Sequence, residues 1–544
     1  MSENSIITDT ADISLLYPTD AAREHSLNRR CRDALSEYTA EQLELYRLID
    51  VKNSPVGEFF TDDRDVLLYR QETFRDILAF PELSELLKGL IPLLEDIVEL
   101  RRMSHENSAS AESYLYSITE VELYTSIISM MKETLIPLKD KVSGRAFGNL
   151  AKAVDILTES EYYKNINRQL EDLTSRVREV KSVTIGVNLD SRLKAESAGV
   201  LSVNNDKFKS GQLIDRVLRL DFKQGDMTCI APLVPFRRDQ SENQQLALTY
   251  ALSSALSEVY KSSIRSWKKV IRSYVLENTD FLIKLLPEIE FVTKAAETLT
   301  DLVSHGCPLC YPEIVAPNEL KFSARGLCNP VVSMKLEGEV VPNDFTFDEN
   351  GMIYILTGPN RGGKSVITCA VGIAFAMAGL GLPVCAESCK VSPADAIFTH
   401  FPQGSEDTID KGRLGEECAR LEGVLDLVTS HSLVLLDESF SSTGAYEGSV
   451  IAGEVICGFA AVGCRAIFST HLHELASRTD ELNARCAEAG GVRIDNLVAE
   501  VDGSKRSFKI VRKSPDGKSY AADIAGKYGL SFDKIREKIK GGRA

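Results

Sequence analysis

Residues 354–365 read Tyr354-Ile355-Leu356-Thr357-Gly358-Pro359-Asn360-Arg361-Gly362-Gly363-Lys364-Ser365. An apolar strand runs into the pattern Gly-x-x-x-x-Gly-Lys-Ser, and a stretch without charge, Val366 to Ala386, follows it. This order of strand, glycine-rich loop and helix is typical of a Walker A phosphate loop. Gly358, Gly362 and Gly363 let the backbone turn tightly and aim its N–H groups at phosphate oxygens, because no Cβ stands in the way.

The end of this pattern predicts a site for ATP and Mg²⁺. The helix that starts near Lys364 adds its positive N-terminal end. Lys364 is expected to bridge the β and γ phosphates, and the hydroxyl of Ser365 to bind Mg²⁺.

Two further strands carry candidate catalytic residues. The run Leu433-Val434-Leu435-Leu436-Asp437-Glu438 delivers two carboxylates at the end of an apolar strand, which is a Walker B pattern. Asp437 is expected to hold Mg²⁺, directly or through a water molecule, and Glu438 to position and activate the attacking water as a general base. The apolar run from Ala466 ends at His471, a placement suited to sensing the γ phosphate. The sequence therefore predicts an ATPase, which converts ATP and water to ADP and phosphate.

Length and charge limit the class of protein. The 544 residues suggest three or four folding units. Lys and Arg number 63 against 79 Asp and Glu, which gives a net charge of -16, so any contact with nucleic acid must be local. With 44% hydrophobic and 26% charged residues, the composition is typical of a soluble globular protein.

The cysteines and the N-terminus favour a cytoplasmic protein. Twelve cysteines are spread along the chain without the dense spacing of a disulfide framework, and the first residues lack a secretory signal. The uncharged segment Val366 to Ala386 is long enough to span a membrane, but it contains three glycines and Pro383 and follows the phosphate loop. We expect a buried helix there and no membrane contact.

The pattern of apolar, polar and proline residues along the chain predicts four regions. Residues 1–55 form an N-terminal helical segment, and 56–305 a mostly α-helical core and lever region with a small β-rich, clamp-like insertion at about 182–236. Residues 306–322, with Pro308, Pro312 and Pro317, are expected to be a linker. From 323 to 544 strands and helices alternate, which predicts an α/β ATPase domain.

In these motifs the sequence resembles the MutS family of DNA mismatch repair and recombination ATPases, which belongs to the ABC class. The resemblance is strong over about residues 325 to 535, and upstream Tyr69-Arg70-Gln71 also looks like the family's core. Its segments are Asn329 to Val332, Val341 to Asp344, Thr357 to Ser365, Pro383 to Glu387, Ala396 to Thr399, Leu433 to Glu438, Ser469 to Leu475, and Lys518 to Leu530.

The resemblance implies roles for several residues. Asn343 and its neighbours would line the adenine pocket, Pro359 and Asn360 would join the phosphate loop, and His471 would be the switch histidine. The segment 518–530 looks like the closing helix-turn-helix that dimerises the ATPase domains. Because ABC-type sites are completed by a partner subunit, the resemblance implies a homodimer.

Three features depart from the family pattern. The signature segment usually has Ser and Thr ahead of a Glu, whereas the run Lys411 to Glu417 places Gly412 and Arg413 there. The loop Ser439 to Gly444 keeps only the small polar character of its counterpart. The N-terminus is expected to be too short for a mismatch-binding domain, and the C-terminus for a nuclease-like Smr domain. Phe80-Pro81-Glu82 and Phe347-Asp348-Glu349 fit the wedge pattern of that missing domain, but neither has its sequence context.

Two weaker patterns leave alternatives open. A basic stripe around Trp267 could meet a DNA backbone or could be a solvated helix face; it comprises Lys261, Arg265, Lys268, Lys269 and Arg272. Arg176, Arg178 and Lys181 form a second candidate of this kind. Cys307, Cys310 and His305 have the spacing of zinc ligands, but no second Cys-x-x-Cys completes a set.

The favoured hypothesis is an ATP-hydrolysing protein that engages mismatched, branched or otherwise distorted DNA like a clamp, in repair or recombination. The alternative is an ATP-gated protein- or RNA-interaction switch that has lost DNA binding. The motor subunit of a transporter is poorly supported, because the chain carries long helical arms of its own.

Overall fold

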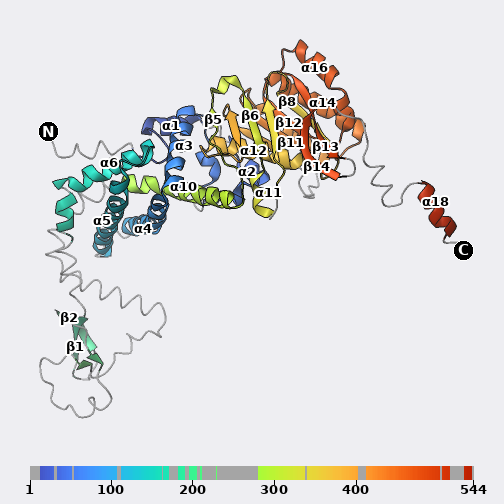
Figure 1. The fold of residues 1–544 in the computed structure, drawn as a ribbon. Coiled ribbons are helices and arrows are strands. Elements are labelled where there is room, and N and C mark those ends of the chain that lie inside the picture. The colour runs from blue at the N-terminus through green and yellow to red at the C-terminus, as the bar shows by residue number, and fades with distance from the viewer. Residues whose placement is uncertain are drawn as a thin grey trace. The chain divides into compact units, whose positions relative to one another are not determined.

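The computed structural model divides into two compact units, which Figure 1 shows along the chain. We call Glu85–Val142 with Gly148–Leu286 the helical unit, and Ser14–Ser84 with Ser143–Phe147 and Pro287–Ala544 the sheet unit. The residues that the structure describes are 13–29, 34–51, 54–106, 112–161, 163–168, 170, 182–189, 191, 195–204, 209–210, 228–229, 280–336, 340–401, 412–502, 505–514 and 532–541.

The helical unit contains long helices and an antiparallel hairpin. The apolar stripe of helix α4 is buried, as Leu87, Leu90, Leu94 and Ile97 are each 0% exposed. In the range of the predicted β-rich insertion, β1 pairs antiparallel with β2, and the short β3 pairs with β4. The elements are α4 (Pro81–Glu106), α5 (Glu112–Leu138), α6 (Arg145–Glu159), β1 (Ser182–Leu189), β2 (Ala195–Asn204), β3 (Lys209–Ser210) and β4 (Thr228–Cys229).

The main sheet of the sheet unit has the strand order β10-β11-β12-β8-β13-β14. The first five strands are parallel and β14 runs antiparallel to β13. Strands β8, β11 and β12 are buried at every position, as expected of a parallel sheet covered on both faces. The α/β architecture predicted for this region is confirmed. The strands are β8 (Ile353–Thr357), β10 (Ile397–His400), β11 (Leu433–Asp437), β12 (Arg465–Ser469), β13 (Ile494–Asp502) and β14 (Lys505–Arg512).

The helices of this region follow the strands. Helix α12 leaves the loop after β8, and α14 connects β11 to β12. Helix α14 alone among the described helices is long and apolar enough to cross a membrane, but it packs on α15, α16 and β8, as core helices do. The helices are α11 (Pro330–Lys335), α12 (Lys364–Gly379), α13 (Arg413–Leu427), α14 (Ala445–Val462), α15 (His473–Ser477), α16 (Thr479–Glu488) and α18 (Phe532–Gly541).

A second sheet includes part of the segment predicted to be a linker. Its order is β5-β9-β6-β7, with β5 (Glu313–Ile314), β6 (Phe322–Leu327), β7 (Asn343–Phe347) and β9 (Ser388–Val391). Residues 306–322 were predicted to be a linker, but β5 lies within them and pairs with β9. Their prolines interrupt helical structure, whereas backbone hydrogen bonds hold this part of the chain in the sheet.

The N-terminal residues pack within the sheet unit, across the boundary predicted at 55. Arg70 of α3 is fully buried and donates to the carbonyls of Leu16, Phe59 and Leu380. Leu380 directly follows α12, so α3 is tied to the end of that helix. The elements are α1 (Asp20–Arg29), α2 (Glu37–Gln42), η3 (Leu45–Arg47), η4 (Val56–Phe59), α3 (Arg64–Ala79), α10 (Asp280–Ser304) and η6 (Pro317–Glu319).

Candidate nucleotide site

The loop between β8 and α12 has a backbone that only glycine tolerates at two points. Gly358 has φ 145° and Gly363 has φ 95°, both in the region that L side chains rarely adopt. A Cβ at Gly358 would lie 2.7 Å from the Cβ of Ala499 on β13, and one at Gly362 would lie 3.2 Å from it. The approach of the loop to β13 therefore accounts for Gly358 and leaves little room at Gly362, whereas Gly363 is required by its φ.

Lys364 is the first residue of α12, and its amine turns back over the loop. The Nζ atom donates to the carbonyl oxygens of Gly358 at 3.2 Å and Pro359 at 3.4 Å. The side chain is buried, which lowers its pKa, while the carboxylates of Glu438 and Asp437 oppose that shift. The amine thus lies where the loop would hold a phosphate.

The three neighbouring strands bring the other predicted residues to one edge of the sheet. Asp437 on β11 pairs in register with Ser469 on β12, and Ser469 with Leu356 on β8, so all three strands end beside the phosphate loop. Glu438 has φ 50° and its N–H donates to the carbonyl of Ser469 at 2.8 Å. A left-handed backbone at a non-glycine residue costs free energy, and such strain is common at functional sites.

Glu438 and His471 are in direct contact. Their Oε1 and Nε2 atoms are 2.8 Å apart, and the same imidazole nitrogen lies 3.4 Å from Lys364 Nζ. Burial lowers the pKa of His471, the charge of Lys364 lowers it further, and Glu438 opposes both. A neutral imidazole with its proton on Nε2 donates to Glu438 and cannot also accept from Lys364. The structure therefore brings Lys364, Glu438 and His471 together.

The residues predicted to hold Mg²⁺ fit that ion. Asp437 is buried, and its Oδ1 atom has no hydrogen-bond partner among the described residues. A buried carboxylate oxygen without a partner is costly unless a cation binds it. Ser365 is exposed in the first turn of α12, which is the position at which the motif places the hydroxyl ligand.

Asn343, which the resemblance places in the adenine pocket, lies at the start of β7 and is hydrogen-bonded within the protein. Its amide donates to the carbonyls of Phe508 at 3.1 Å and Val341 at 3.3 Å, and accepts from the N–H of Ile510 at 2.8 Å. The amide therefore ties β7 to β14, which leaves its role in an adenine pocket a prediction.

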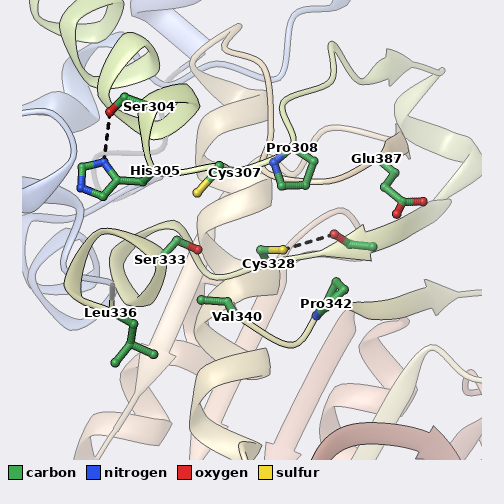
Figure 2. Close-up of a pocket in the computed structure, with 12 residues that line it drawn as sticks. Ser304, His305, Cys307, Pro308, Cys328, Ser333, Leu336, Val340, Pro342 and Glu387 are labelled. Atoms are coloured by element: carbon green, nitrogen blue, oxygen red, sulfur yellow. Dashed lines mark hydrogen bonds between the residues drawn. The ribbon is translucent and has the colours of Figure 1, made fainter. Parts of the chain in front are cut away.

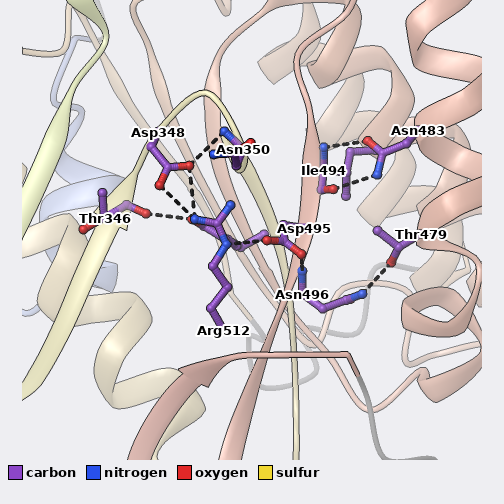
Figure 3. A network of polar contacts seen from close by, with 10 residues as sticks. Thr346, Asp348, Asn350, Thr479, Asn483, Ile494, Asp495, Asn496 and Arg512 are labelled. Atoms are coloured by element: carbon purple, nitrogen blue, oxygen red, sulfur yellow. Dashed lines mark hydrogen bonds and ion pairs between the residues drawn. The ribbon is translucent and has the colours of Figure 1, made fainter.

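Sequence reasoning missed Phe508 on β14. This side chain is 45% exposed, has φ 57°, and lies 3.7 Å from where a Cβ on Gly363 would be. Nothing in its local sequence marks it, because β14 reaches the loop only through sheet pairing. Figure 3 shows how β14 is held: Arg512 binds Asp348 after β7 at 2.8 Å and also contacts Asp495 on β13.

The loop after Glu438 is anchored to two other elements. The N–H of Phe440 donates to the buried carboxylate of Glu417 on α13 at 2.7 Å. His400 at the end of β10 contacts the hydroxyl of Ser439 at 2.6 Å. Glu417, the last residue of the predicted signature segment, thus links α13 to the residues that follow the candidate base.

Several predicted residues lie outside the described part of the chain. These are Lys411 of the signature segment, the basic stripe from Lys261 to Arg272, the second basic candidate, and the dimerisation segment 518–530. Asn360 is exposed in the phosphate loop, and Arg413 is exposed as the first residue of α13. Neither of these two places contradicts its predicted role.

The parallel sheet, the glycine loop and the acidic strand end define a P-loop nucleotide-binding domain. The description "MutS domain V" matches residues 354–536, and "MutS2 N-terminal domain" matches residues 62–305. The chain belongs to the MutS family, as the resemblance of its motifs predicted.

Similar curated proteins carry related names. A "DNA mismatch repair protein MutS" from Clostridium kluyveri is 25% identical over 87% of this chain and 55% of its own length. One from Lactobacillus delbrueckii subsp. bulgaricus is 28% identical over 55% of this chain and 32% of its own. Human "DNA mismatch repair protein Msh6" is 35% identical over 31% of this chain and 13% of its own. The chain thus spans about half or less of the length of these relatives.

We expect His400 to make the protein sensitive to acid. Burial lowers its pKa to about 4, helped by the charge of Arg420, while an unfolded chain binds the proton near pH 6.5. The contribution of His400 to the free energy of unfolding is therefore fully present above pH 6.5. It falls by up to about 3 kcal/mol as the pH drops to about 4. Urea unfolding should show that the free energy of unfolding decreases less between pH 7 and pH 4 for His400→Asn than for wild type. His473→Asn, at an exposed histidine, controls for the substitution, and equal losses in wild type and His400→Asn would contradict the assignment.

Proposed function

We propose that this protein binds ATP with Mg²⁺ at the phosphate loop and hydrolyses it. The observation that carries the proposal is the contact of His471 with both Lys364 and Glu438, next to an Asp437 oxygen that has no hydrogen-bond partner within the described part of the chain. A cation, a carboxylate base and a metal ligand within one strand edge are the groups that phosphoryl transfer needs. Membership of the MutS family, whose members are ATPases, supports the same proposal.

The chain's own groups suggest a sequence of roles. Lys364 would exchange the carbonyls of Gly358 and Pro359 for phosphate oxygens, since charged acceptors bind an ammonium more strongly than neutral ones. Asp437 and Ser365 would hold Mg²⁺, which when bound neutralises charge on the phosphates. Glu438 would take a proton from water. His471, by donating a hydrogen bond to Glu438, would keep that carboxylate oriented until the γ phosphate accepts the hydrogen bond from His471 instead.

Phe508 supplies a candidate surface for the base of the nucleotide. Its exposed ring lies beside Gly363, and a purine has an aromatic face that stacks on such a ring. Its left-handed backbone is held because Asn343 binds the carbonyl of Phe508 and the N–H of Ile510. We therefore assign Asn343 to positioning this strand and Phe508 to contacting adenine.

Substitutions at the site should separate binding from turnover. Lys364→Ala is expected to weaken ATP binding at least 10-fold, because the loop loses its only ammonium at the phosphates. Glu438→Gln should keep binding but lower kcat by about 10²- to 10⁴-fold, the usual contribution of a general base. Calorimetric binding and phosphate release check both, with Lys321→Ala, an exposed lysine before β6, as the control. Turnover by Glu438→Gln at the wild-type rate would remove the base assignment.

We also propose that the nucleotide state controls engagement of distorted DNA. The relatives are named DNA mismatch repair proteins, and the family's N-terminal description covers the long helices of residues 62–305. The basic stripe around Trp267 is the candidate contact, because it stands out in a chain of net charge -16.

DNA binding should depend on salt through this stripe. Replacing Lys261, Arg265, Lys268, Lys269 and Arg272 by Gln should flatten the slope of log affinity against log salt by up to about 4, since each phosphate contact contributes about 0.9. The control replaces Lys132, Lys152 and Lys164, exposed on other helical segments, and should leave the slope unchanged. Gel shifts on homoduplex, mismatch, loop and four-way junction DNA, with and without ATP, provide the affinities. Absence of binding to every substrate would favour a switch that acts on protein or RNA.

We propose further that two copies of the chain associate. Helix α18 exposes apolar side chains one and two turns apart, with Phe532 75%, Ile535 39% and Ile539 57% exposed. Such a stripe at i, i+3 and i+7 is an incomplete interface, and a second α18 is a self-complementary partner for it.

Sedimentation should reveal this association. Wild-type protein is expected to sediment as a dimer, and Ile535→Glu with Ile539→Glu as a monomer, because charge on the stripe opposes burial. Glu537→Gln, on the same helix outside the stripe, is the control. A dimer that persists unchanged in the double variant would place the interface elsewhere.

A further inference from the structure

The cavity beside the predicted zinc residues is not arranged to hold a metal ion. It has a volume of about 780 Å³ and is lined by the loop after α10, the end of β6, α11 and the segment before β7. Figure 2 shows Cys307 and Cys328 at its wall, with Cys328 Sγ donating to the carbonyl of Gly326 at 3.5 Å. Among the residues that the structure describes, no group of His, Cys, Asp or Glu is placed to bind a metal. The zinc site that the spacing of His305, Cys307 and Cys310 suggested is therefore not formed.

Helix α13 is a surface helix that buries a carboxylate. Of its fifteen residues only Glu417 and Leu421 are buried, and because they are four positions apart they lie on one face of the helix. Burial of a carboxylate is costly unless hydrogen-bond donors replace the water that it loses. The partner of Glu417 therefore explains why this residue lies inward.

That partner is the backbone of the turn that carries the candidate base. The N–H of Phe440 donates to Glu417 Oε2 at 2.7 Å, and this contact is buried. Phe440 has φ 63° and Glu438 has φ 50°, so two of three consecutive residues have the left-handed backbone that side chains disfavour. Such a turn persists only where its surroundings hold it in place.

Three contacts hold this turn. At its start, the N–H of Glu438 donates to the carbonyl of Ser469 on β12 at 2.8 Å. In its middle, His400 at the end of β10 contacts the hydroxyl of Ser439 at 2.6 Å. At its end, the carboxylate on α13 accepts the N–H. Strands β12 and β10 are buried at every position, whereas α13 lies at the surface, so only the third contact depends on where a surface helix lies.

We propose that Glu417 is a positioning residue for ATP hydrolysis, an inference that rests on the proposed role of Glu438 as the general base. The backbone at residue 438 decides where its side chain points, and its Oε1 atom lies 2.8 Å from His471 Nε2. By holding the N–H two residues further on, Glu417 keeps the left-handed turn and so keeps the base beside His471. Glu417 acts through the turn and not on the nucleotide.

The position of α13 therefore controls turnover and not ATP affinity. The phosphate loop and Lys364 belong to β8 and α12, which do not depend on the bond between Glu417 and Phe440. A change at residue 417 that breaks this bond should lower kcat and leave the Kd for ATP as it is.

Substitutions that separate the length of the side chain from its charge test the proposal. Glu417→Gln keeps an oxygen acceptor at the same reach, so kcat should stay within about 3-fold of wild type although the acceptor is neutral. Glu417→Asp keeps the charge but withdraws it by one bond length, about 1.5 Å. Both Glu417→Asp and Glu417→Ala should lower kcat by about 10- to 100-fold, because the base is misplaced. Phosphate release gives kcat, and calorimetry with ATP gives Kd.

Two controls accompany these variants. Glu422→Ala, at an exposed glutamate of the same helix, should leave both kcat and Kd unchanged. Thermal unfolding followed by circular dichroism shows that each variant is folded at the assay temperature. Should Glu417→Ala fail to fold, the pair Glu417→Asp and Glu417→Gln decides.

A double variant shows whether Glu417 acts through the base. In the Glu438→Gln background, Glu417→Asp should cause no further loss of kcat, because there is no base left to position. The proposal is overturned if Glu417→Asp has wild-type kcat, if Glu417→Gln loses as much as Glu417→Asp, or if the two losses multiply in the double variant. These three outcomes leave the base assignment standing. Wild-type turnover by Glu438→Gln would overturn the base assignment and this proposal together.

Discussion

The close approach of the phosphate loop to β13 is the constraint on which the site depends. Ala499 leaves no room for a side chain at Gly358, and little at Gly362. The loop is therefore pressed against the sheet, and its backbone turns so that Lys364 begins α12 at the point where its amine lies over the loop. A larger side chain at Ala499 would act on the loop as a glycine substitution does, although it belongs to a strand more than 130 positions away.

The parallel strands bring the functional residues of the candidate site to one edge of the sheet. Because β8, β12 and β11 are in register, the ends of three strands deliver the loop, the histidine and the two carboxylates to one edge. Glu438 has a strained, left-handed backbone. The loop that follows it is fixed by the hydrogen bond from the N–H of Phe440 to Glu417 of α13. Glu417 of α13 is hydrogen-bonded to the N–H of Phe440, two residues after the candidate base Glu438, so a movement of α13 would be transmitted to that loop.

Local patterns predicted the parts of this site that are contiguous in sequence. The phosphate loop, Asp437, Glu438 and His471 follow apolar strands, and alternation of strands and helices predicted the sheet that gathers them. Phe508 and His400 were not predicted, and Glu417 was included only as part of the signature segment. The contacts of all three arise through pairing or packing with a distant segment. The same reason explains why 306–322 were predicted to be a linker. Prolines indicate locally where a helix ends, but the pairing of β5 with β9 joins segments far apart in the sequence. The adenine-pocket role of Asn343 stays a prediction, and the structure adds that its amide is hydrogen-bonded to β14.

A crystal structure with Mg²⁺ and a non-hydrolysable ATP analogue would test the central claim most directly. The account predicts that Lys364 Nζ leaves the carbonyls of Gly358 and Pro359 for the phosphates, and that Mg²⁺ lies about 2.0–2.1 Å from its oxygen ligands, Asp437 Oδ1 and Ser365 Oγ among them. A nucleotide bound elsewhere, with Lys364 still hydrogen-bonded to both carbonyls, would contradict it.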